Sequence, residues 1–155
     1  MSASAAAVSP EPRTGPRNDL AAAELLAEHG FPGHAVETAA RAALRAAQLA
    51  LAALDETRDH PSDVVSAYVR RVVRERAMDP QTGRHLRSLL NRAELAARST
   101  APTPDTEAAA ALADARLVLD AVDHWLADPA RSGPSATETT RLRVRPLPKR
   151  KASQT

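Results

Sequence analysis

Residues 34–54 form an alanine-rich stretch in which apolar side chains recur at every third or fourth position. This spacing places them on one side of an α-helix. The chain contains only one Trp, one Tyr and one Phe, so its core has to be built from Ala, Leu and Val. Such a core favours closely packed helices over a sheet. We therefore predict a central helix at residues 34–54 and an all-α fold.

Three further helices are predicted from proline residues near their starts. Proline is favoured in the first turn of a helix because the missing N–H has no partner there in any case. The sequences HPSD at 60–63, DPQT at 79–82 and TPDTE at 103–107 follow this rule, and Asp79 and Thr103 are the expected caps. The predicted spans are 61–78, 80–98 and 104–127.

A shorter helix is predicted before the central one. Asp19 is a favourable N-terminal cap, and Gly30 can adopt the left-handed conformation that ends a helix. We therefore expect this helix to run from Asp19 to His29. Residues 1–17 are rich in Ala, Ser and Pro, a composition typical of a disordered leader.

The predicted architecture is a small antiparallel helical bundle within residues 18–128, made of four main helices and the short N-terminal helix. Residues 129–155 end in the basic sequence RLRVRPLPKRK followed by four further residues, and we interpret them as a disordered basic tail. The abundance of Ala and Arg suggests a bacterial source. Because Cys and a recognisable signal peptide are absent, we expect a cytoplasmic protein. The longest apolar run contains several charges, so no membrane span is expected.

The charges are strongly segmented along the chain. Residues 70–98 carry eight Arg against three acids, and residues 130–155 carry seven basic residues against one acid. Residues 99–129 carry one Arg against six acids. The acidic helix predicted at 104–127 could therefore lie beside the basic helices and neutralise much of their charge.

The arginines of the helix predicted at 61–78 lie opposite its apolar side. At about 100° per residue, Tyr68 falls among the valines on one side of this helix. Arg76 falls on the same side as the valines, so we expect it at an end of the bundle, with its charge reaching water or an acid. The candidate polyanion-binding residues are Arg70, Arg71, Arg74, Arg84, Arg87, Arg141, Arg143, Arg145, Lys149, Arg150 and Lys151.

No motif in the sequence indicates catalysis. Neither a glycine-rich phosphate loop nor a nucleophile elbow is present, and no histidines share metal-ligand spacing on a helix. Asp120 and His124 are four residues apart, but a stable metal site needs at least three ligands. We assign no catalytic, cofactor-binding or metal-binding residue and expect the protein not to be an enzyme.

The favoured interpretation is a non-catalytic interaction or regulatory protein that acts through helix faces. Its partner would be an unknown protein or a second copy of the chain, because the apolar stripe of the helix at 104–127 is broad. The alternative is a DNA-binding protein that uses the basic tail together with the arginine side of helices 61–78 and 80–98. A helix-turn-helix around the turn at 78–80 is a variant of this alternative. It is disfavoured because the first helix would be about twice the length that such a motif needs.

Overall fold

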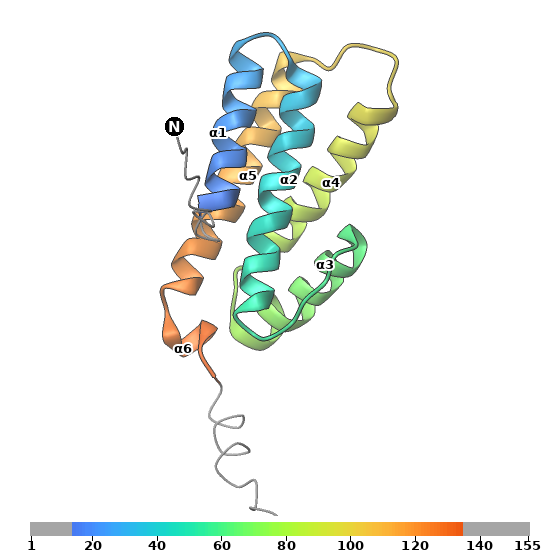
Figure 1. Ribbon diagram of the computed structural model, residues 1–155. Helices are drawn as coiled ribbons and strands as arrows, with labels where there is room; N and C mark the ends of the chain where they lie inside the picture. Colours follow the sequence, from blue (N-terminus) through green and yellow to red (C-terminus); the bar gives the residue numbers. More distant parts are fainter. Residues whose placement is uncertain (1–13, 135–155) are drawn as a thin grey trace, which may run out of the picture.

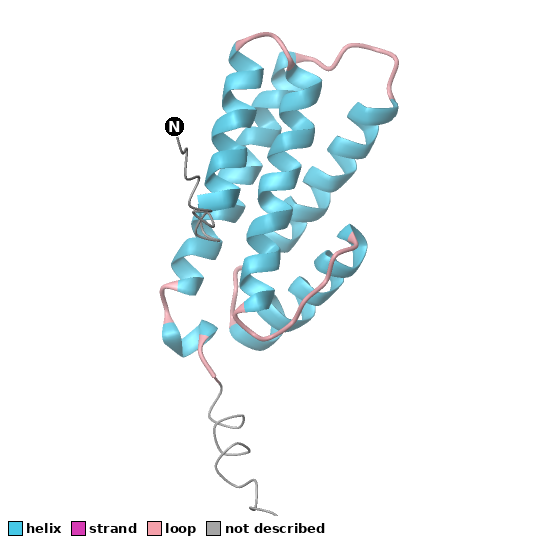
Figure 2. Ribbon diagram, in the orientation of Figure 1, coloured by secondary structure: helices cyan, strands magenta, loops and turns pink. Residues whose placement is uncertain are grey.

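The computed structural model describes residues 14–134. This part of the chain consists of helices and the loops between them, as Figure 2 shows, which confirms the predicted all-α class. The elements are α1 (Thr14–Glu28), α2 (Pro32–Ala52), α3 (Pro61–Ala67), η1 (Tyr68–Arg74), α4 (Pro80–Arg98), α5 (Asp105–Leu126) and α6 (Pro129–Ser132).

Helix α2 is the central element, as predicted. It contacts α1, α5, α4, α3 and η1. Ten of its 21 side chains are buried, and eight of these are alanine. Because alanine is small, the neighbouring helices can approach the α2 backbone closely. Figure 1 shows α1, α2 and α5 side by side, with α1 running opposite to α2 and α5, while α4 leans away from α2 toward its C-terminal end.

Helix α1 begins at Thr14, five residues before the predicted start, and is a full member of the bundle. The prediction that Asp19 caps this helix is wrong, because Asp19 lies inside it and accepts a hydrogen bond from Arg45 at 2.9 Å. Pro16 is tolerated because it occupies the first turn. Gly30 ends the helix region with a φ of +84°, as predicted. Residues 1–13 of the predicted leader lie outside the described residues.

The predicted helix at 61–78 is a continuous helix of two kinds. α3 is α-helical and η1 is a π-helix, and the helical segment ends at Arg76. This segment contacts both α2 and α4. Tyr68 is fully buried there and exchanges a hydrogen bond of 2.8 Å with the hydroxyl of Thr82 on α4. Burial raises the pKa of the Tyr68 hydroxyl to about 12, against a smaller opposite effect of this hydrogen bond.

The helix predicted at 104–127 is present as α5, and its apolar stripe is buried inside the chain. Val118 and Trp125, which the helical wheel places at the edge of the stripe, are both 0% exposed. The surface that suggested self-association is therefore already covered by the bundle. None of the described helices is both long and apolar enough to cross a membrane.

Arg76 lies at the end of the bundle, as expected, and its side chain binds carbonyl oxygens there. Its guanidinium donates to the main-chain oxygen of Arg131 at 3.1 Å and to that of Gly133. The main-chain oxygen of Arg76 accepts a hydrogen bond from Trp125 Nε1 at 3.0 Å. Arg76 thus ties the end of the helical segment that contains α3 and η1 to α5 and to α6, a short helix that begins inside the predicted tail.

Candidate functional site

A groove of about 920 Å³ lies between the α3–η1 segment and α4. We call it the arginine groove. It is lined by Val69, Val73, Arg74, Pro80, Gly83, Arg84, Arg87, Ser88, Asn91, Arg92, Leu95 and Glu107. A second hollow of about 560 Å³ extends from it along α3 and shares Arg87 and Asn91 with it.

Part of the lining of the arginine groove is apolar. Gly83 allows α4 to approach η1 closely, because a Cβ at this position would lie 3.1 Å from Cγ2 of Val69. Val69 and Val73 were predicted on the buried side of their helix, but the structure leaves both only partly buried. Leu95 lies on α4 toward its C-terminal end and is 69% exposed. The groove therefore offers apolar surface to a ligand along much of its length.

Three of the predicted arginines line this groove from both of its helices. Arg74 belongs to η1, and Arg84 and Arg87 belong to α4. All three are exposed, and none forms a hydrogen bond or ion pair with another residue that the structure describes. A guanidinium stays protonated at any physiological pH. The groove thus carries three positive charges that no described carboxylate neutralises.

The single carboxylate in the groove is bound to a fourth arginine. Arg92 donates to Glu107 of α5 at 2.6 Å and to the hydroxyl of Ser88 at 3.3 Å. Sequence reasoning did not select Arg92 or Leu95 as site residues. At about 100° per residue, Leu95 falls on the side of α4 opposite the buried Leu86, and this position was the available signal that Leu95 is a surface residue.

The other two predicted helical arginines, Arg70 and Arg71, are paired with carboxylates outside the groove. Arg70 donates to Oε1 of Glu56 at 3.1 Å, and Arg71 donates to Glu75 at 2.7 Å while lying 3.9 Å from Oε2 of Glu56. Arg58 also donates to Glu56. Glu56 comes from the loop before α3, and its side chain is only 16% exposed. The predicted arginine side of helix 61–78 is therefore divided, and only Arg74 reaches the groove.

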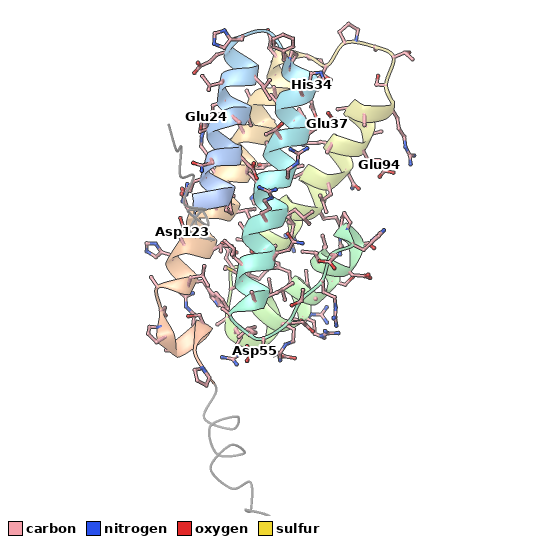
Figure 3. All side chains as sticks on the ribbon, in the orientation of Figure 1. Glu24, His34, Glu37, Asp55, Glu94 and Asp123 are labelled. Carbon is pink, nitrogen blue, oxygen red and sulfur yellow. The ribbon has the colours of Figure 1, made fainter. Side chains whose placement is uncertain are left out.

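The acidic helix α5 does not cover the arginine groove. Its Asp120 and Asp123 form ion pairs with Arg17 of α1, at 2.7 and 2.6 Å. Figure 3 shows Asp123 on the opposite side of the molecule from Glu94, which projects from α4. Among the described residues, the other contact of this kind between α5 and α4, after that of Glu107 with Arg92, is that of Asp114 with Nδ1 of His85, at 3.2 Å.

The remaining predicted site residues belong to the C-terminal basic segment. Arg141, Arg143, Arg145, Lys149, Arg150 and Lys151 all lie outside the described residues. Among residues 14–134, no group of three or more His, Asp or Glu side chains could hold a metal ion.

The helix before the turn at 77–79 is continuous from Pro61 to Arg76. This length is the feature that made a helix-turn-helix motif unfavourable from the sequence.

Comparison with models of known protein families found no match, and searches among curated proteins and solved structures also found none.

Proposed function

We propose that this chain is a non-catalytic interaction or regulatory protein, and that the arginine groove is its binding surface. One observation carries the proposal. Arg74, Arg84 and Arg87 approach the groove from two helices and leave three charges without a partner in the described residues. Arg17 and Arg116, by contrast, are matched with carboxylates. An anionic partner would supply the missing charges.

The groove chemistry supports binding better than catalysis. Ser88 and Glu107 are its only hydroxyl and carboxyl side chains, and both are held by Arg92. Arginine itself does not exchange protons near neutral pH, so it suits anion recognition rather than acid–base chemistry. In the bacterial cytoplasm that the composition suggests, such a groove would act by holding a partner.

Site-specific photocrosslinking tests this proposal. A photoreactive amino acid replaces Asn91, which is exposed within the groove, in the full chain expressed in its source cells. The matched control carries the same amino acid at Arg41, an exposed position on α2.

We expect adducts that form only from position 91 and that disappear when Arg74→Glu and Arg87→Glu are combined. Identical adducts from both positions, or adducts that the charge reversal leaves unchanged, would contradict the proposed binding surface.

Binding of nucleic acid is the second candidate function. The three unmatched groove arginines favour it, because cations without protein partners can neutralise phosphates. The six basic residues between Arg141 and Lys151 would add to the same contact.

Titration of labelled duplex DNA at several salt concentrations tests this candidate. The variants are a chain that ends at Pro134, which keeps the carbonyl partners of Arg76, and the combined Arg74→Gln, Arg84→Gln and Arg87→Gln variant. Each is expected to bind more weakly and with a smaller salt slope than the full chain. No binding at low salt would exclude the candidate.

A further inference from the structure

We propose that the partner in the arginine groove is an amphipathic helix with acidic residues on both sides of an apolar stripe. This inference rests on the proposed function, since it names the occupant of the same surface. Its basis is the combination of unmatched cations on both walls with an apolar lining that reaches an exposed leucine.

The apolar lining has the dimensions of a short helical ligand. Gly83 and Leu95 are 12 residues apart on α4, which corresponds to about 18 Å along the helix axis. A docked helix of about three turns covers this distance and presents apolar side chains at positions i, i+3 or i+4, and i+7. Burying Leu95, now 69% exposed, would contribute to its affinity.

The cations are placed to bind anions on both sides of such a stripe. Arg74 lies on η1, whereas Arg84 and Arg87 lie on α4. Carboxylates that flank an apolar stripe can therefore be held from both walls, and an arginine can bind each one through two hydrogen bonds. A nucleic-acid backbone offers phosphates but no apolar stripe to cover Val69, Val73 and Leu95. The mixed lining thus favours an acidic protein helix over a nucleic acid.

No segment of the chain itself has the free acidic residues that an occupant of the arginine groove needs. The C-terminal segment outside the described residues is basic and would be repelled by the groove arginines. The N-terminal 13 residues contain one acid, Glu11, and one base, Arg13. The acids of α5 that face α1 are already paired with Arg17. We therefore assign the acidic helix to a different protein.

A designed peptide provides the direct test. The probe is a labelled helical peptide of about 16 residues with Leu at helical spacing and Glu on both flanks. Its control has the same composition in a scrambled order, so that the apolar stripe is lost. Binding to the full chain is measured by fluorescence anisotropy, with labelled duplex DNA titrated in parallel. The emission of Trp125 verifies that every variant is folded.

The variants separate charge from apolar contact. Combining Arg74→Gln with Arg87→Gln is expected to weaken peptide binding roughly threefold to tenfold. Arg41→Glu lowers the net charge by the same amount on α2 and should leave binding nearly unchanged. Leu95→Ser is expected to weaken peptide binding roughly tenfold without changing the affinity for DNA.

The outcomes distinguish this inference from the function on which it rests. Equal binding of the ordered and scrambled peptides would overturn it. Unchanged peptide binding by the Leu95→Ser variant would overturn it as well. If DNA binds more tightly than the peptide and depends on Arg74 and Arg87, the groove remains a binding surface and only the assigned partner is wrong. If neither ligand responds to these arginines and position 91 gives no specific crosslink, both proposals fail.

Discussion

Replacing Arg76 by Met should detach α6 from the end of the bundle. The guanidinium of Arg76 donates to the main-chain oxygens of Arg131 and Gly133, and Met keeps much of the side-chain volume without a donor. Hydrogen bonds from charged donors contribute about 1.5–3 kcal/mol each when protected from water. These bonds are only partly buried, so we expect the free energy of unfolding to fall by about 2 kcal/mol in total. The Trp125 hydrogen bond goes to the main chain of residue 76 and is retained.

Urea unfolding followed by the emission of Trp125, the only tryptophan, measures this loss. We expect a lower midpoint with an unchanged slope. Arg74→Met is the matched control, because Arg74 is exposed two residues earlier and has no partner in the described residues. It should change the free energy of unfolding by less than about 0.5 kcal/mol. Equal stabilities of Arg76→Met and the unchanged protein would refute the assigned role.

A truncation provides a second check on the same contact. Ending the chain after Asp128 removes α6 and both carbonyl partners of Arg76. If Arg76 acts through these carbonyls, the truncation should cost less in the Arg76→Met background than in the unchanged protein, because the two changes remove one shared interaction. Additive effects would show that Arg76 stabilises the fold through other contacts.

Three further perturbations follow from buried or strained positions. Because the folded-state pKa of Tyr68 is raised from 10 to about 12, unfolding releases a proton above pH 10, and stability should fall by up to about 1.4 kcal/mol per pH unit between pH 10 and 12. Tyr68→Phe should reduce this slope, and the absorbance of the single tyrosine reports the pKa directly. Ala77 has a φ of +56°, so Ala77→Gly should stabilise the protein by up to about 1 kcal/mol, measured by urea unfolding; a loss of stability would contradict strain at this residue. Trp125→Phe removes the Nε1–H that donates to the carbonyl of Arg76 and leaves a smaller side chain in the core. The free energy of unfolding should therefore fall by about 1–3 kcal/mol, measured by thermal unfolding followed by circular dichroism. An unchanged midpoint would contradict this contact.

The helices of this chain were largely predictable because their signals are local. Prolines mark the starts of α3 and α4, and the side chain of Asp79 caps α4 by accepting from Gln81 N. Alanine spacing identified α2 as the central helix. The start of α1 was missed because the surrounding Ser, Ala and Pro residues resemble a disordered leader. Burial of Leu20 and Ala23 against the bundle, which stabilises α1, is not encoded in local composition.

The candidate site was only partly predictable because the pairing of each arginine with a carboxylate depends on contacts between different elements of the fold. Arg70, Arg71 and Arg74 look equivalent on a helical wheel, yet Arg70 donates to Glu56 in the loop before α3 and Arg71 donates to Glu75. Counting charges by segment also suggested that α5 neutralises the basic helices. In the structure, Glu107 and Asp114 of α5 do face α4, whereas Asp120 and Asp123 pair with α1. Which arginines remain unmatched depends on tertiary contacts. The sequence could therefore identify the basic segment but not the groove.

The most direct test of the binding surface is the NMR response of the arginine side chains to the acidic helical peptide. In the labelled full chain, the Nε–Hε signals of Arg74, Arg84 and Arg87 should shift on titration, and the shifts should diminish with added salt. The signals of Arg17 and Arg116, which are already paired with carboxylates, should stay in place. Larger shifts at Arg17 or Arg116 than at the groove arginines, or no shift at any of the five, would contradict the assignment of the groove.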